Sequence, residues 1–139
     1  MLNFPKTLNL SQRKLDQFDD SNTPEPQCYT KLNLSHNNVT ILDNIYRFSN
    51  IQFLDLKFNK LKYIPKLENF PKLESIDLSF NEITSLESLG SKSLVRADIS
   101  FNKIVILDSF EKNVNLKFLN VSHNEIKEIR PLSSKHNVI

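Results

Sequence analysis

The sequence predicts an α/β solenoid, a curved stack of about six coils with a parallel β-sheet on its concave face. Three observations predict it. The 139-residue chain uses leucine 20 times and asparagine 17 times. A ten-residue pattern recurs along almost its whole length. Short segments in which apolar residues alternate are followed by segments in which they recur every third position, which is typical of stacked repeats.

The repeat has five clear copies and one divergent copy. The clear copies are TKLNLSHNNV (30–39), QFLDLKFNKL (52–61), ESIDLSFNEI (74–83), VRADISFNKI (95–104) and KFLNVSHNEI (117–126). The divergent copy, TLNLSQRKL (7–15), has Arg13 where the others have asparagine. Successive asparagines are 22, 22, 21 and 22 residues apart, and Arg13 precedes the first of them by 24. Spacing this regular indicates a repeat architecture.

Each copy contains its own strand and turn signals. In the cleanest copy, Leu54 and Leu56 point inward from a short strand. Apolar residues then recur every third position from Leu61, which predicts a short helical or 3-10 segment on the convex face. The asparagine turns inward, where its amide can satisfy backbone groups of neighbouring coils. The predicted structural ladder is Asn37, Asn59, Asn81, Asn102 and Asn124.

This pattern, LxxLxLxxNxL, resembles the leucine-rich repeat over almost the whole chain. The residues that carry the resemblance in the cleanest copy are Ile51, Leu54, Leu56, Asn59 and Leu61. The repeat length is similar to that of the short, 22-residue intracellular subclass, which includes the regulatory subunit of type-one protein phosphatase. The resemblance implies a curved solenoid with a parallel sheet on the concave face. It does not by itself imply that partner.

The repeats define a single domain over residues 1–139. Residues 1–28 form an N-terminal cap and an atypical first repeat, residues 29–137 form five regular repeats, and residues 138–139 start a missing or absent next coil. No cap-like sequence follows the last copy, although solenoids need polar terminal caps for solubility. We therefore expect either a divergent short protein or fragment, or a contact between the uncapped C-terminal coil and a partner or second copy.

Side chains between the inward residues form columns on the concave face. One column stacks three carboxylates at the strand spacing of ~4.8 Å, where they repel and favour an arriving Lys or Arg. Another column is aromatic. Together they predict a docking surface for a segment with one basic and several apolar side chains. The predicted partner-binding residues are Asp55, Asp77, Asp98, Phe53, Phe58, Phe80, Arg96, Phe101 and Phe118.

Two structural alternatives to this docking surface stay open. In the first, the aromatic residues before the ladder asparagines simply pack along the edge of the sheet. In the second, Lys57 and Arg96 neutralise the aspartates internally and leave no net field.

Composition excludes several classes of function. The single glycine, Gly90, excludes a Gly-rich phosphate loop and a nucleophile elbow. The single cysteine, Cys28, excludes an intrachain disulfide and a cysteine zinc cluster. A net charge of +2 does not predict direct nucleic-acid binding. His36 and His123 lie four strands apart and cannot share a metal. We expect no catalytic residues, no metal and no cofactor.

The sequence therefore predicts a non-catalytic protein-binding module that holds a partner protein on its concave face, as a regulatory or scaffold subunit. Partners implied by the resemblance are a phosphatase catalytic subunit, a cytoskeletal or ciliary component, or another scaffold. The alternative is the leucine-rich component of a ribonucleoprotein assembly, similar to the spliceosomal protein that clamps an RNA-binding partner. An enzyme has only the adjacent pairs Ser35–His36 and Ser122–His123 to support it, and neighbouring strand side chains point oppositely.

The predicted location is the cytoplasm, with the nucleus as the alternative. The N-terminus lacks a basic region followed by an apolar core, so we do not predict a signal peptide. No apolar run approaches the ~18 residues of a membrane span, so we expect no membrane partner. The use of a single cysteine fits a reducing compartment.

Overall fold

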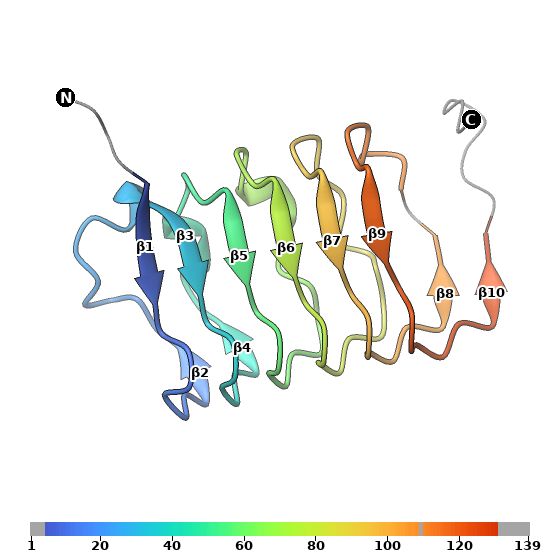
Figure 1. Ribbon diagram of the computed structural model, residues 1–139, viewed down its shortest axis with the longest axis horizontal. Coiled ribbons are helices and arrows are strands. Elements are labelled where there is room, and N and C mark those ends of the chain that lie inside the picture. Colours follow the sequence, from blue (N-terminus) through green and yellow to red (C-terminus); the bar gives the residue numbers. More distant parts are fainter. Residues whose placement is uncertain (1–4, 109, 131–139) are drawn as a thin grey trace.

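The computed structural model describes residues 5–108 and 110–130, which wind into a solenoid of about six coils. Each coil contributes one strand to a six-stranded parallel sheet, and all six strands run the same way (Figure 1). We number the coils 1 to 6 by these strands. In spatial order they are β1 (Lys6–Asn9), β3 (Tyr29–Asn33), β5 (Phe53–Asp55), β6 (Ser75–Asp77), β7 (Arg96–Asp98) and β9 (Phe118–Asn120). The predicted fold is confirmed.

The sheet keeps equivalent repeat positions side by side. Leu54 of β5 pairs with Leu32 of β3 on one side and with Ile76 of β6 on the other. All three are buried, with 1–2% of their surface exposed. Because neighbouring strands are in register, the outward-facing residues of successive coils also form straight columns. The columns predicted from the sequence therefore exist as continuous rows on the concave face.

The convex side is more extended than the predicted helical segments. Its 3-10 helices are η1 (Pro26–Cys28), η2 (Ile45–Arg47) and η3 (Leu67–Asn69), and its strand pairs are β2 (Gln17–Phe18) with β4 (Ile41–Leu42) and β8 (Ile106–Leu107) with β10 (Glu128–Ile129). The described residues contain no α-helix. A coil of about 22 residues has few residues with which to close its circuit. 3-10 and extended segments cover the distance with fewer residues, because they advance ~2.0 and ~3.3 Å per residue, against ~1.5 Å for an α-helix.

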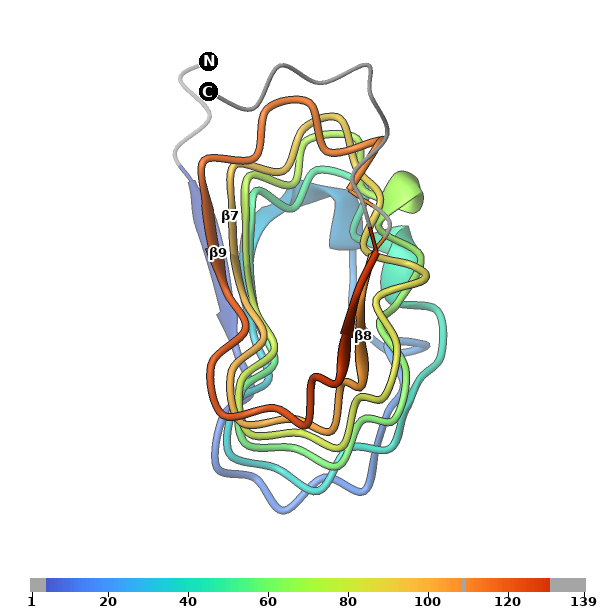
Figure 2. The same ribbon diagram turned by 90° about the vertical axis from the view of Figure 1, so that its right-hand side faces the viewer.

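Figure 2 shows the coils stacked one behind another. The hydrophobic core lies inside them. The three-residue apolar spacing after the ladder asparagine is confirmed in coil 3, where Leu61, Ile64, Leu67, Phe70 and Leu73 are all at most 5% exposed. Since i and i+3 eclipse in a 3-10 segment, this spacing keeps one side of the convex face inside.

The N-terminal loop also contributes to the interior. Asp20 is fully buried, and its Oδ2 lies 3.1 Å from Nη1 of Arg47 in coil 2. The same Nη1 donates a hydrogen bond to the Asp20 carbonyl at 3.3 Å. Neither carboxylate oxygen of Asp20 has a hydrogen bond within the described residues. Arg47 is therefore the counter-ion that ties the cap loop to the second coil. The other end of the predicted domain, residues 131–139, lies outside the described residues.

Candidate functional site

The ladder asparagines bind each coil to the one before it. Nδ2 of Asn81 donates to the carbonyls of Leu56 at 3.0 Å, Leu78 at 3.1 Å and Ser79 at 3.3 Å. Its Oδ1 accepts the N–H of Leu61 at 2.9 Å. The same set of contacts, one coil earlier or later, occurs at the other ladder positions, Asn37, Asn59, Asn102 and Asn124. These side chains are committed to the backbone and are not available to a ligand.

The aspartate column closes the turn that ends each strand. Oδ1 of Asp77 accepts the backbone N–H of Ser79 at 3.0 Å and the Ser79 hydroxyl at 2.6 Å. Asp98 makes the same two bonds to Ser100. Asparagine serves equally well, because Asn120 accepts the corresponding N–H and hydroxyl of its own coil. One carboxylate oxygen of each aspartate is thus structural, and the second oxygen of Asp98 also accepts a hydrogen bond from Nδ2 of Asn120 at 3.2 Å.

Charge in this column is only partly compensated. Burial raises the pKa of the Asp55 carboxyl, and the charge of Asp77 adds to the rise, while the Lys57 N–H and ammonium lower it. Nζ of Lys57 lies 3.9 Å from Oδ2 of Asp55. Arg96, the other counter-ion considered from the sequence, instead lies over the ring of Phe118, 3.8 Å from its centroid. Within the described residues, Oδ2 of Asp77 has no polar partner.

The residues before the ladder asparagines form a continuous aromatic stack. Its rings, in order, belong to His36, Phe58, Phe80, Phe101 and His123. Successive centroids are 4.5, 4.2, 4.2 and 4.1 Å apart, and the planes lie within 17° of parallel. The rings pack along the edge of the sheet, just beyond the strand ends. The three phenylalanines are still 38–40% exposed, so their ring edges face outward while their faces are occupied.

Every residue of the stack has a left-handed backbone, with φ between 53° and 56°. The sequence contains no glycine at these positions to signal this conformation, which is unusual for a bulky side chain. The turn is held by hydrogen bonds between coils; the N–H of Phe80, for example, donates to the Ser100 carbonyl at 3.1 Å. Ring stacking and these bonds offset a backbone strain of about 1–2 kcal/mol per residue.

Because of this strain, we expect a glycine variant to be more stable than an alanine variant at the same position, which reverses the usual order. Replacing Phe80 with alanine removes two ring contacts but keeps a Cβ at positive φ, and should lower the free energy of unfolding by about 2 kcal/mol. Replacing it with glycine removes the same contacts and the strain, so the glycine variant should be about 1 kcal/mol more stable than the alanine variant. Urea unfolding of both variants measures the difference. An alanine variant that is the more stable of the two would show that the backbone there is unstrained.

The upper concave row, where the strands begin, mixes aromatic and cationic side chains. Phe53 is 41% exposed and Phe118 is 39% exposed. Nζ of Lys31 lies 5.1 Å from the ring centroid of Phe53, so both aromatic rings of this row carry a cation. Between Phe53 and Arg96 the register places Ser75, the smallest side chain of the row, in the coil of Asp77. Asp77 is therefore the aspartate whose carboxylate is least covered by the side chains of this row.

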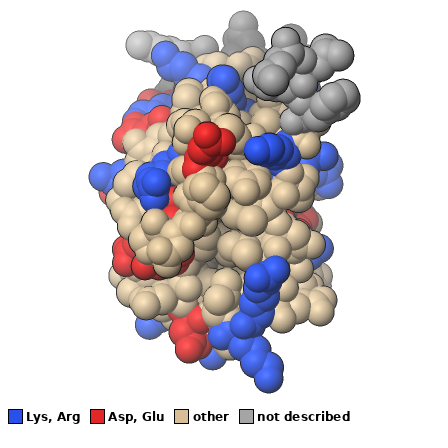
Figure 3. Space-filling view, turned by 90° about the vertical axis from the view of Figure 1, so that its left-hand side faces the viewer, with Lys and Arg blue, Asp and Glu red and all other residues tan. Residues whose placement is uncertain are grey.

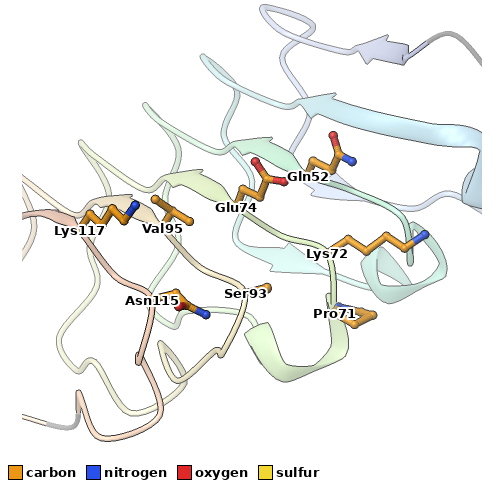
Figure 4. A pocket seen from close by; sticks show the side chains of 8 residues that line it. All are labelled: Gln52, Pro71, Lys72, Glu74, Ser93, Val95, Asn115 and Lys117. Carbon is orange, nitrogen blue, oxygen red and sulfur yellow. The ribbon is translucent and has the colours of Figure 1, made fainter. Parts of the chain in front are cut away.

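A polar hollow of about 410 Å³ lies at the edge where the strands begin (Figure 4). It is lined by Gln52, Pro71, Lys72, Glu74, Ser93, Val95, Asn115 and Lys117. Two of these side chains are already committed to the backbone, since Ser93 donates to the Leu73 carbonyl at 2.7 Å and Asn115 to that of Lys92 at 2.7 Å. Within the described residues the Ser93 hydroxyl makes no bond to Glu74 or to either lysine of the lining.

Cys28 and the Ser35–His36 pair are the other chemical groups that the sequence singles out. Cys28 is exposed at the end of η1, and its thiol donates to Oε2 of Glu25 at 3.6 Å. Ser35 is buried, whereas its neighbour His36 stacks on Phe58. Across residues 5–108 and 110–130 no three His, Cys, Asp or Glu side chains are grouped so as to hold a metal ion. In the same residues no helix is long and apolar enough to cross a membrane.

Comparison with known proteins agrees with this architecture. A family model described as "Leucine Rich repeats (2 copies)" matches residues 49–91, and one described as "Leucine Rich repeat" matches residues 112–127. The chain has the leucine-rich repeat fold. None of the curated proteins compared with it matches by sequence.

Solved leucine-rich repeat structures superpose on most of the chain. The functional domain of InlJ from Listeria monocytogenes is 26% identical with a TM-score of 0.72, covering 89% of this chain and 26% of that one. A Shigella effector leucine-rich repeat domain is 30% identical with a TM-score of 0.72, covering 89% and 52%. TLR13, solved in complex with ssRNA13, is 25% identical with a TM-score of 0.81, covering 91% and 19%. The chain thus spans about half or less of the length of each.

Proposed function

We propose that this leucine-rich repeat protein is a non-catalytic interaction module that binds a partner protein on its concave face. Leucine-rich repeat domains commonly mediate protein–protein interaction. The observation that carries the proposal is the concave surface itself, where exposed aromatic edges flank a row of aspartates whose middle member, Asp77, has an outer oxygen with no polar partner within the described residues. The binding residues proposed are Asp55, Asp77, Asp98, Phe53, Phe58, Phe80, Arg96, Phe101 and Phe118.

The chemistry of this face favours a segment with one basic and several apolar side chains. A Lys or Arg placed against Oδ2 of Asp77 would meet a carboxylate oxygen that has no polar partner within the described residues, with Asp55 and Asp98 on either side. Apolar side chains would cover the ring edges of Phe53 and of the stack. Buried aromatic anchors of this kind typically contribute about 2 kcal/mol or more each to binding.

The proposed regulatory role and the proposed location rest on the sequence. The 22-residue repeat resembles the subclass that includes the type-one phosphatase regulatory subunit, which supports a role as a regulatory or scaffold subunit. We propose a cytoplasmic location, with the nucleus as the alternative, because a single cysteine fits a reducing compartment.

A ribonucleoprotein component is the second candidate, because TLR13, one of the structural neighbours, was solved with a single-stranded RNA. Charge argues against direct RNA contact. The concave column is acidic, and Figure 3 shows both signs interspersed on the N-terminal end with no broad area of one sign. Phosphate recognition needs a basic stripe. In this candidate function the protein would therefore bind an RNA-binding protein rather than RNA.

The test is a lysate pull-down with variants that copy residues already used in the columns. Asp55→Asn, Asp77→Asn and Asp98→Asn together remove the charge but keep the turn that Asn120 forms. Phe53→Ser introduces the side chain of Ser75. After circular dichroism shows folding, we expect at least one protein captured by the wild type to fall roughly tenfold in the combined variant. The control is Glu87→Lys, an exposed position on the convex side.

Two outcomes would contradict the proposal. If the combined variant captures the same proteins at the same level as the wild type, the concave rows are structural. If a labelled single-stranded RNA binds the chain directly, with affinity that falls steeply between 50 and 200 mM salt (about 10³-fold for several phosphate contacts), RNA binding replaces protein binding.

A further inference from the structure

A groove of about 600 Å³ runs along the convex face between coils 2 and 3. Most of the side chains that line it are apolar. Three of them are unusually exposed for their type: Ile41 is 50% exposed, Tyr46 is 55% exposed and Tyr63 is 78% exposed. Single exposed apolar side chains are ordinary, but several around one groove mark an interaction site. The volume is in the range that accommodates a few side chains of a ligand.

The groove exists because coils 2 and 3 separate there. The N–H of Lys60 donates to the Val39 carbonyl at 3.0 Å, and the strand β4 that follows in coil 2 pairs with β2 of coil 1. Coil 3 supplies no matching strand, since its chain reaches Pro65, which has no N–H, and then enters η3. One edge of β4 is left open. Figure 2 shows η2 and η3, in cyan and light green, projecting on this side.

The charge beside the groove is mainly positive. Lys66 lines it, and Lys60 and Lys62 flank the lining residues Leu61 and Tyr63. All three lysines are exposed, and none forms an ion pair within the described residues. Asp43 is the one carboxylate among the lining residues. The single acid of η3, Glu68, already lies 3.8 Å from Lys112 of coil 5. The convex groove therefore has the opposite charge preference to the concave aspartate row.

We propose that this convex groove is a second docking site, and that its occupant is a linear segment of a partner protein carrying two apolar side chains flanked by Asp or Glu. The apolar side chains insert against Ile41, Tyr46 and Tyr63, and the acids pair with Lys62 and Lys66. A second copy of the chain fits less well, because a two-fold contact would bring two lysine-rich rims together. The site is independent of the concave face, so each can bind while the other is changed.

Selection of peptides tests the proposal without a known partner. The intact chain is immobilised through a biotin on Cys28, which is exposed and does not line the groove. A phage library of random twelve-residue peptides is then selected against it. We expect enriched peptides that combine an apolar pair with Asp or Glu. A synthetic peptide of that consensus should bind roughly tenfold more weakly to Tyr63→Ser and to Lys62→Glu/Lys66→Glu.

The variants are chosen to keep the fold. Tyr63 and both lysines are exposed, and coil 4 has Ser85 at the position equivalent to Tyr63. The matched control is the concave variant with Asp55, Asp77 and Asp98 changed to asparagine, which should bind the peptide as the wild type does.

Four results would overturn the proposal. They are no enrichment above the bare surface, enriched peptides that are basic, equal binding to both groove variants, or a dimer in sedimentation that Tyr63→Ser abolishes. The last result would assign the groove to a second copy. Because the concave control is run in parallel, failure here leaves the proposed concave function unaffected.

Discussion

Replacing Asn81 with leucine is expected to lower the free energy of unfolding by about 3–5 kcal/mol. The substitution conserves approximate volume but removes three donated bonds and one accepted bond. It also leaves the N–H of Leu61 buried without the amide oxygen that accepts it, whereas the Leu78 carbonyl keeps Nδ2 of Asn102 as a donor at 2.9 Å. Unsatisfied buried groups cost about 1–3 kcal/mol each, so the loss exceeds what side-chain size predicts.

Urea unfolding followed by circular dichroism measures this loss. The matched control is Asn115→Leu, since Asn115 is exposed and makes one side-chain bond, to the Lys92 carbonyl at 2.7 Å. That change should cost about 1 kcal/mol or less. Equal losses in the two variants would mean that the ladder adds no more than any surface asparagine.

Replacing Arg47 with methionine is expected to cost about 2–3 kcal/mol. Removing one partner of a buried ion pair usually costs about 3–5 kcal/mol, because the other charge is left buried and unpaired. The loss is smaller here because the Arg47 side chain is 45% exposed, whereas that of Asp20 is fully buried. Methionine keeps most of the aliphatic packing of arginine, so the change reports the charge.

A double-mutant cycle isolates this pair. Asp20→Asn with Arg47→Met removes both charges, and the double variant should recover about 1 kcal/mol or more relative to Arg47→Met alone. Thermal or urea unfolding of the four proteins supplies the coupling free energy. Strict additivity would refute the idea that Arg47 stabilises the buried carboxylate.

The repeat made the fold predictable. Leu54, Leu56 and Asn59 recur at equal spacing. Each of them has the equivalent residues of the adjacent coils as its neighbours, so the repeat pattern defines its environment. The columns of the concave face followed from the same register. The structural use of the aspartates also had a signal, because the Asp-x-Ser sequence at 77–79 and 98–100 is typical of a side chain that bonds the backbone two residues on.

Other features depended on contacts that the pattern does not encode. The left-handed φ of Phe80 lacks the glycine or asparagine that normally signals it. Asp20 lies in a polar loop, and its burial arises from Arg47, which is 27 residues away. The convex groove arises where one copy departs from its neighbours, and Pro65 within an apolar segment was the available signal.

Because of the asparagine ladder, the effect of a substitution on unfolding depends on its position along the solenoid as much as on its chemistry. Each ladder side chain joins only adjacent coils, so the molecule behaves as a one-dimensional lattice in which order passes from coil to coil. Loss of Asn37 weakens the joint next to the first coil, and the remaining coils stay contiguous. Loss of Asn81 divides the lattice into two blocks of three coils. The same substitution should therefore fray an end in one case and abolish single-step unfolding in the other.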